Sequence, residues 1–175
     1  MKVAIFGGAS AKPGETVYED ARRLGVLLAA AGYTVMTGGY IGVMEAASRG
    51  ANTAGGHVIG VTCKEIEHWR GTGANPWVKE EWSFETLRER MYALIDACDA
   101  AVVMPGGVGT LAELAVMWNE QIINDNPAKP LILVGEGWQD MLEHFFTDFG
   151  GFIKPPDRAL VQIVPDISAV MTVLQ

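Results

Sequence analysis

Residues 100–123 read AAVVMPGGVGTLAELAVMWNEQII, in which an apolar run, a glycine-rich turn and a helical pattern follow one another directly. The run 100–104 is short and apolar throughout, which predicts a strand covered on both faces. The turn 105–110 comes next, and the pattern from 110 to about 123 predicts a helix. A strand that leads through a glycine turn into a helix is the unit from which parallel α/β sheets are built.

The same alternation continues in both directions along the chain. We expect Gly32 to stop the first helix and Ser83 to cap the third, while residues 63–79 are expected to form a long loop. Strands are predicted at 3–6, 33–37, 57–62, about 78–82, 100–104, 131–134 and 160–163, and helices at about 16–31, 41–54, 83–97, 110–123, 139–148 and 166–174. The pattern predicts one α/β domain over residues 1–175: a doubly wound, Rossmann-like parallel sheet with helices on both faces.

Composition excludes several classes of partner and site. The formal net charge of −8 argues against a nucleic-acid polymer as partner, although it leaves room for a phosphorylated small molecule. The two cysteines, Cys63 and Cys98, lack the spacing of a zinc site, so we expect reduced thiols and no metal. No apolar stretch is long enough to span a bilayer, and the start of the chain does not resemble a signal peptide. We therefore expect a cytoplasmic protein without a membrane partner.

Three glycine pairs fall where a predicted strand passes into a helix. They are Gly7-Gly8, Gly38-Gly39 and Gly106-Gly107. Ligands of doubly wound sheets bind beyond the carboxyl ends of the strands, where the strand order reverses, so these turns are expected to share one site. Beside the longest loop, we expect Gly8, Ser10 and Gly39 to contribute to it. The alternative for each pair is that its glycines only form a tight turn.

The longest of these turns, Pro105-Gly106-Gly107-Val108-Gly109-Thr110, has the chemistry of an anion site. Glycines let consecutive N–H groups converge on an anion, and the helix that follows adds the partial positive charge of its N-terminus. We expect Gly106, Gly107, Gly109 and Thr110 to bind a phosphate. The loop does not end in Gly-Lys-Ser/Thr, so it is not the P-loop of a nucleoside triphosphatase. The first turn, 7–10, is not a Gly-x-Gly-x-x-Gly fingerprint either.

Glu113 allows two interpretations. Thr110-Leu111-Ala112-Glu113 matches a capping box, in which the glutamate bonds back to the amide at the start of its helix. On spacing alone this structural role is favoured. In either role the carboxylate would lie within side-chain reach of whatever the loop binds.

These residues resemble a known family. Residues 105–113, PGGVGTLAE, are similar to the PGGxGTxxE signature of the Lonely Guy proteins, often labelled lysine decarboxylase-like. Residues 38–44 resemble in part that family's second motif, GGGxxGLMG, and residues 88–91 fall at its His-Glu-Arg-Lys element. The resemblance extends from about residue 3 to 134.

The resemblance implies a Rossmann-like homodimer that hydrolyses nucleoside 5′-monophosphates. In that family the N-glycosidic bond of cytokinin riboside 5′-monophosphates, or of AMP, is cleaved to free base and ribose 5-phosphate without a metal or organic cofactor. Carried onto this chain, the catalytic residues are Arg90 and Glu113. Arg88 competes with Arg90, since residues two apart on a helix do not face the same way. Without the resemblance, an exposed arginine paired with a neighbouring carboxylate is the simpler reading of Arg90.

The alternative function is a non-catalytic protein of the same fold that binds a nucleotide or carries a cofactor, such as a molybdenum-cofactor carrier. Tyr40 and Glu45 favour it, because a large ring would crowd a ligand at that turn and a carboxylate would add negative charge near the site. Lysine decarboxylation itself is rejected. It would use a pyridoxal cofactor on a lysine, and no such motif surrounds Lys12, Lys64, Lys79, Lys129 or Lys154.

Several aromatic residues can be interpreted in two ways. Trp69, Trp77 and Trp82 could stack on a base, or could form the core of an ordered loop or a contact between subunits. Trp118 and Ile122, on the helix after the glycine loop, are expected in packing or in a subunit interface.

Overall fold

The computed structural model describes residues 1–123 and 129–174, and it contains one sheet of seven parallel strands. The strands are β1 (Lys2–Phe6), β2 (Thr34–Thr37), β3 (Val58–Cys63), β4 (Glu80–Phe84), β5 (Ala100–Val103), β6 (Leu131–Val134) and β7 (Val161–Val164). The helices are α1 (Thr16–Ala30), α2 (Val43–Thr53), α3 (Lys64–Arg70), α4 (Leu87–Ala97), α5 (Val108–Ile123), α6 (Glu136–Phe149), α7 (Pro155–Arg158) and α8 (Ile167–Val173), with a 3₁₀ turn at Gly150–Phe152. Within the described ranges, no helix combines the length and the apolar character needed to cross a membrane.

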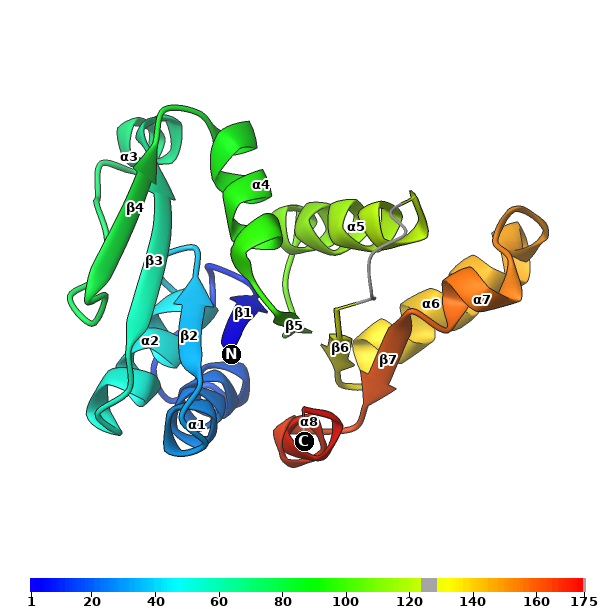
Figure 1. Ribbon diagram of the computed structural model, residues 1–175, viewed down its shortest axis with the longest axis horizontal. Coiled ribbons are helices and arrows are strands. Elements are labelled where there is room, and N and C mark those ends of the chain that lie inside the picture. Colours follow the sequence, from blue (N-terminus) through cyan, green and yellow to red (C-terminus); the bar gives the residue numbers. More distant parts are fainter. Residues whose placement is uncertain (124–128, 175) are drawn as a thin grey trace.

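Helices cover both faces of the sheet, with α1, α2 and α8 on one side and α4 and α5 on the other (Figure 1). Side chains of successive strand residues enter opposite layers because the strand period is two. In β1, for example, Val3 and Ile5 pack with the first group of helices, and Ala4 and Phe6 with the second. Strands β5 and β6 are therefore continuously apolar, as their sequences predict, whereas β2 and β3 also bury one threonine each, Thr37 and Thr62.

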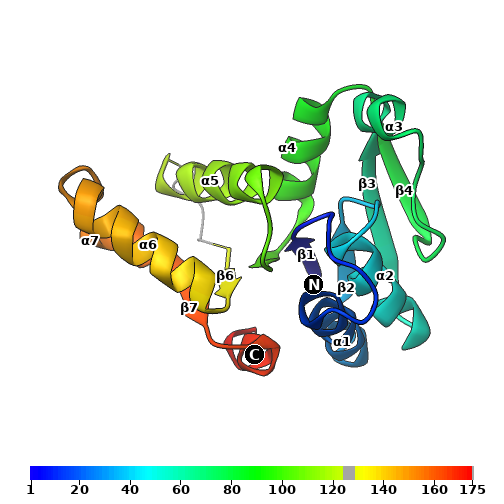
Figure 2. The same ribbon diagram turned by 180° about the vertical axis from the view of Figure 1, so that it is seen from behind.

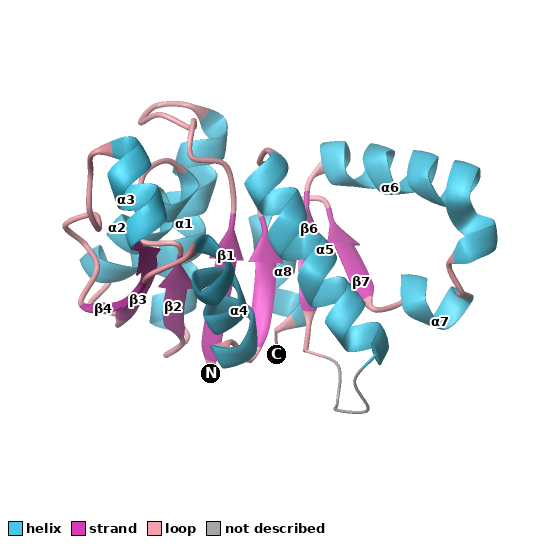
Figure 3. Cartoon of the chain, turned by 90° about the horizontal axis from the view of Figure 1, so that it is seen from above, coloured by secondary structure: helices cyan, strands magenta, loops and turns pink. Residues whose placement is uncertain are grey.

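The strand order β4-β3-β2-β1-β5-β6-β7 reverses direction at β1. After β1 the chain adds β2, β3 and β4 on one side, and then returns to place β5 on the other (Figure 3). The paired ends of β1 and β5, Phe6 and Val103, bring their glycine turns together. The doubly wound fold is confirmed, and the reversal lies at the sheet edge where the sequence predicts the ligand site.

The expectation of a loop over residues 63–79 is wrong in its first half. Lys64–Arg70 forms α3, which ends at Gly71 with a φ of 70°. Seven residues span only about two helical turns, too few for a hydrophobic period to stand out. The short helix α7 was missed for the same reason.

The expected cap at Ser83 is also wrong. Ser83 lies within β4, and Thr86 caps α4 instead. The Thr86 hydroxyl accepts from the amide of Glu89, and the Glu89 carboxylate accepts from the amide of Thr86, which completes a capping box. The expected stop at Gly32 is confirmed: α1 ends at Ala30, Ala31 is its C-cap, and Gly32 follows with a φ of 78°.

Candidate functional site

A cavity of about 600 Å³ opens at the carboxyl ends of β1, β2 and β5. We call it the sheet-edge cavity. Five segments of chain surround it: the turns after β1 and β2, the start of α5, and the facing sides of α3 and α4. Its polar and charged lining consists of Ser10, Tyr40, Trp69, Arg70, Arg90, Thr110 and Glu113. The cavity thus lies at the reversal point of the sheet, where backbone amides and a few charged side chains meet.

The glycine loop is packed tightly against the turn after β1. The amide of Gly8 donates to the carbonyl oxygen of Pro105 over 3.0 Å. A Cβ at Gly106 would overlap the Thr110 hydroxyl and lie 2.9 Å from the nitrogen of Gly8. Gly106 is therefore required for close approach between the two turns.

The amides at the start of α5 are free. Helix α5 begins at Val108, two residues before the predicted start, and Val108 is 85% exposed. The N–H groups of residues 106–110 donate to no acceptor in the part of the chain that the structure describes. Together with the positive end of the helix, free amides of this kind can bind an anion, and we call residues 106–110 the anion seat.

Most of the residues that were expected to bind the phosphate are part of the cavity lining. Gly39 and Gly106 lie outside its lining. Gly39, with a φ of 78°, packs against the side chain of Thr62 on β3, and Gly106 lies under Thr110. The lining residues among those expected are Gly8, Ser10, Gly107, Gly109 and Thr110.

Arg90 is held by two elements at once. It is 5% exposed and reaches from α4 across the end of β3, where its Nε donates to the carbonyl of Val61 over 2.8 Å. Its Nη1 donates to Oε1 of Glu113 over 3.2 Å. A Cβ at Gly38 would overlap this guanidinium group, so that glycine provides its space. The reading of Arg90 as an exposed surface arginine is wrong.

Arg88, the competitor of Arg90, faces away from the cavity. It is exposed on the outer side of α4, and its guanidinium group lies 6.0 Å from the centre of the Tyr92 ring. Two residues on a helix are separated by about 200° of rotation, so only one of the pair can face the sheet. Arg90 is that residue.

Glu113 does not form the predicted capping box. Because α5 begins at Val108, Thr110 is already inside the helix, and the Glu113 carboxylate turns to Arg90. Burial raises the pKa of the Glu113 carboxyl above its usual value, although the charge of Arg90 acts in the opposite direction. A carboxylate with a raised pKa and a fixed arginine partner is a candidate acid–base or charge-stabilising group.

Tyr40 forms a rigid wall of the cavity. It is 1% exposed, its hydroxyl donates to the carbonyl of Cys63 over 3.0 Å, and it accepts from the amide of Cys63 over 2.7 Å. Burial raises the pKa of Tyr40 to about 12. Asn75 fixes the backbone of the same turn by donating to the carbonyls of Gly39 and Tyr40. The Tyr40 ring is therefore buried and anchored where it lines the cavity.

Arg70, which the sequence analysis missed, lies against this wall. Its guanidinium carbon is 5.6 Å from the centre of the Tyr40 ring and 5.4 Å from that of Trp69. It belongs to α3, the helix that was expected to be loop. No sequence signal marks Arg70, because it stands outside every motif and its neighbours have no readable period.

Glu45 and two of the three loop tryptophans lie outside the cavity lining. The Glu45 carboxylate accepts from the hydroxyl of Tyr18 on α1. Of the three loop tryptophans, only Trp69 lines the cavity, where it is 78% exposed. Trp77 lies under the guanidinium group of Arg49, and Trp82 donates to Glu80.

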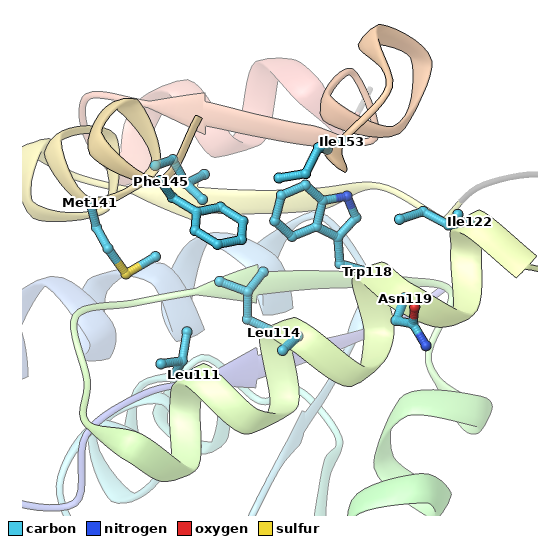
Figure 4. A pocket seen from close by; sticks show the side chains of 10 residues that line it. Leu111, Leu114, Trp118, Asn119, Ile122, Met141, Phe145 and Ile153 are labelled. Carbon is cyan, nitrogen blue, oxygen red and sulfur yellow. The ribbon is translucent and has the colours of Figure 1, made fainter. Parts of the chain in front are cut away.

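A second, apolar cavity of about 370 Å³ lies between α5 and α6, and we call it the α5–α6 groove (Figure 4). Trp118 forms its floor, is 9% exposed, and donates from Nε1 to the carbonyl of Asp157 over 2.7 Å. Leu111, Ile122 and Phe145 are each about 40% exposed along it. Its lining also includes Leu114, Ala115, Asn119, Met141, Leu142 and Ile153. Apart from one asparagine the lining is apolar, which distinguishes it from the sheet-edge cavity.

Neither metal ligands nor a lysine mark the sheet-edge cavity. Among the described residues, no three His, Cys, Asp or Glu side chains are grouped to hold a metal ion. None of the chain's lysines, all of which the structure describes, is among the residues that line the cavity.

Comparison with known proteins shows which family this chain resembles. Residues 44–174 match the family described as "Possible lysine decarboxylase". The chain is 33% identical over 169 residues to the cytokinin riboside 5′-monophosphate phosphoribohydrolase of Mycobacterium tuberculosis, covering 94% of this chain and 88% of that protein. The chain belongs to the Lonely Guy family. A further family relative is the cytokinin riboside 5′-monophosphate phosphoribohydrolase LOG1 of Arabidopsis thaliana, 30% identical over 179 residues, covering 99% of this chain and 82% of that one.

Solved structures of similar fold include carriers as well. The molybdenum cofactor carrier protein of Chlamydomonas reinhardtii superposes with a TM-score of 0.77 and 26% identity, covering 99% of this chain and 94% of that one. The molybdenum cofactor binding protein of Rippkaea orientalis has the same TM-score and coverage at 25% identity. Membership of the Lonely Guy family thus fixes the fold, while the family's neighbours differ in what their names say they do.

Proposed function

We propose that this chain is a nucleoside 5′-monophosphate phosphoribohydrolase, which cleaves the N-glycosidic bond of AMP or of a cytokinin riboside 5′-monophosphate. The observation that carries the proposal is the pair of Arg90 and Glu113, 3.2 Å apart, in the same cavity as the free amides of the glycine loop. The family relatives at 30–33% identity have names that state this reaction.

The 5′-phosphate binds at the start of α5 in this proposal. Free amides of residues 106–110 donate to its oxygens, and the Thr110 hydroxyl and the Ser10 side chain lie at the same end of the cavity. The helix N-terminus favours the phosphate charge further. Binding of this group fixes the ribose beside Glu113, one helical turn along α5.

Glu113 and Arg90 perform the hydrolysis. Departure of the base leaves a ribose with oxocarbenium character. The Glu113 carboxylate either stabilises this positive charge or activates the water that attacks C1′. The oxygen of that water bonds to C1′, the C1′–N bond breaks, and its electron pair stays on the base. Arg90 holds the carboxylate in place, because its own Nε is anchored to Val61 on β3. The products are free base and ribose 5-phosphate.

Incubation with AMP and with isopentenyladenosine 5′-monophosphate, followed by chromatography of the free base, tests the proposal. We expect base and ribose 5-phosphate to appear in equal amounts, without added metal. Glu113→Ala is expected to release no base while its circular dichroism spectrum stays unchanged. Nucleotide that binds and is never cleaved by the unaltered chain would overturn the proposal.

That same outcome would favour the second candidate, a carrier or binding protein. Its support is the likeness to the two molybdenum cofactor proteins, which is as extensive in coverage as that to the hydrolases. The pair of Arg90 and Glu113 weighs against the carrier function, because a buried carboxylate does not improve the affinity of a site for an anion.

We also propose that the chain forms a homodimer or a higher homo-oligomer, with the α5–α6 groove in the interface. Exposed apolar residues are gathered along it, and such patches on folded chains mark interaction surfaces (Figure 4). For its location we propose the cytoplasm, where a reducing environment suits two buried, unpaired cysteines, Cys63 and Cys98.

A further inference from the structure

Arg70 has a buried donor that nothing in the described chain satisfies. Its Nη1 is inaccessible to solvent and has no hydrogen-bond partner among the described residues. No ligand can reach this enclosed nitrogen. Arg70 nevertheless lines the sheet-edge cavity, and its Nε and Nη2 are accessible and also make no hydrogen bond within the described residues, so these are the donors that a ligand in the cavity can meet.

The surroundings hold this guanidinium group in place without satisfying it. It lies against the rings of Tyr40 and Trp69, which attract the cation through their faces and offer no acceptor in their plane. Tyr40 is immobile because its hydroxyl bonds twice to the backbone of Cys63. Arg70 is therefore positioned before any ligand arrives.

Arg70 lies at the end of the cavity opposite the anion seat. It belongs to α3, which follows β3 directly, whereas the anion seat follows β5. Three strand spacings separate β5 from β3 in the sheet, roughly 14 Å. Figure 2 shows α3 at the far side of the sheet from α5, beyond α4. One phosphate cannot contact both ends, but a mononucleotide with its phosphate at α5 directs its base toward Arg70.

The proposed reaction needs a group at this end. When the C1′–N bond breaks, its electron pair passes to the base and spreads to the other ring nitrogens, so the departing base becomes more basic. Among the described residues that line the cavity, Glu113 is the single carboxylate, and it lies at the ribose. The Tyr40 hydroxyl is engaged with Cys63, and its raised pKa makes it a poor acid.

We propose that Arg70 is a catalytic residue that stabilises the departing base by donating a hydrogen bond from Nε or Nη2 to a ring nitrogen of that base. The inference rests on the proposed phosphoribohydrolase function and adds a role that the Arg90–Glu113 pair does not fill. Water oxygen bonds to C1′, one water proton passes to Glu113 and on to solvent, and the base leaves with the electron pair. The base then takes a proton from solvent, since arginine itself keeps its protons.

Two substrates with different leaving groups test this role. AMP needs help to expel its base, whereas 4-nitrophenyl ribofuranoside 5-phosphate expels a stable anion without help. We expect Arg70→Ala to lower kcat for AMP by roughly a hundredfold or more, the usual loss for one transition-state donor, with little change in KM. For the nitrophenyl substrate kcat should fall at most about threefold, which corresponds to about 0.7 kcal/mol of transition-state stabilisation.

Two further variants complete the design. Arg70→Lys, which retains a donor, should recover part of the kcat for AMP. Arg88→Ala, the matched control on the outer side of α4, should leave both substrates unchanged. Equal losses on both substrates, or no loss on AMP, would overturn the role of Arg70 and leave the proposed function intact. Failure of the unaltered chain to cleave either substrate would overturn both.

Discussion

Helix α5 borders two cavities of opposite character. On one side, Thr110 and Glu113 face the sheet-edge cavity, together with free backbone amides and two arginines. On the other side, Leu111, Leu114 and Trp118 face α6 across an apolar groove. The groove is lined by apolar side chains and one asparagine, and its lining contains no charged group. The comparison teaches that chemistry in this fold arises at the strand ends, while the outer helix face offers surface for assembly.

The largest expected effect lies at the sheet-edge cavity. Glu113→Gln keeps the size of the side chain and removes its charge, so kcat for AMP should fall by between roughly a hundredfold and ten-thousandfold. Steady-state kinetics measure it, with thermal unfolding as a check on the fold. The matched control is Leu111→Gln, at a residue on the groove side of α5. The kcat of this variant should stay close to that of the unaltered chain. Similar losses in the two variants would erase the distinction between the cavities.

Gly106→Ala tests whether the glycine loop forms the anion seat. The added methyl group would overlap the Thr110 hydroxyl and press on the Gly8 amide, which displaces the loop. A displacement of this kind is expected to cost roughly a hundredfold in kcat/KM for AMP. The binding of ribose 5-phosphate, followed by calorimetry, should weaken as well.

Gly137→Ala on α6 is the control for this substitution, because an added Cβ there meets nothing within 4 Å. It should leave kcat/KM unchanged and raise the stability of the helix by roughly 0.5–1 kcal/mol. An unchanged affinity of Gly106→Ala for ribose 5-phosphate would contradict a seat built on this loop.

The pH dependence of kcat separates a buried carboxylate from an exposed one. Glu113 is active as the carboxylate, and burial raises its pKa, so kcat should decline as the pH falls, with a midpoint above that of an ordinary glutamate. Arg90 acts to lower the same pKa, and removing its charge in Arg90→Gln should move the midpoint higher still. A midpoint at or below the ordinary value, or one indifferent to Arg90, would count against the pair as the acid–base centre.

The smallest effect on turnover is expected in the α5–α6 groove. Ile122→Glu places a charge on its apolar face and should shift the chain toward monomers in sedimentation experiments across a concentration series. Turnover per chain should stay within about threefold, since distant sites act nearly independently. Ile163→Glu on β7, outside the groove and similarly exposed, is the control and should not alter assembly. Unchanged assembly in Ile122→Glu would remove the groove from the interface.

The sequence was most informative where the local pattern and the tertiary fold agree. The strand over 131–134 was predicted with its true bounds, and the edge of the sheet that holds the site followed from three glycine pairs at strand-to-helix turns. These signals are local: an apolar run for a buried strand, and a glycine where two turns touch. Gly106 is the plainest case, because its need for space reflects the contact with Gly8.

The parts that could not be predicted depend on neighbours distant in sequence. Thr110-x-x-Glu113 reads as a capping box, and only the approach of Arg90 from another helix gives the glutamate a different partner. Arg70 carries no motif, and its significance arises from Tyr40, 30 positions earlier, and from a donor left without an acceptor. Helix α3 is too short to show a period, so the residue that closes the far end of the cavity was hidden in an expected loop.

The central claim is that one nucleotide spans the cavity, with its phosphate on the amides of residues 106–110 and its ribose at Glu113. A crystal structure of Glu113→Gln soaked with AMP tests it most directly. The account predicts phosphate oxygens within hydrogen-bond distance of those amides, C1′ beside residue 113 and the base toward Arg70. A phosphate bound elsewhere, or a ribose turned away from residue 113, would contradict it.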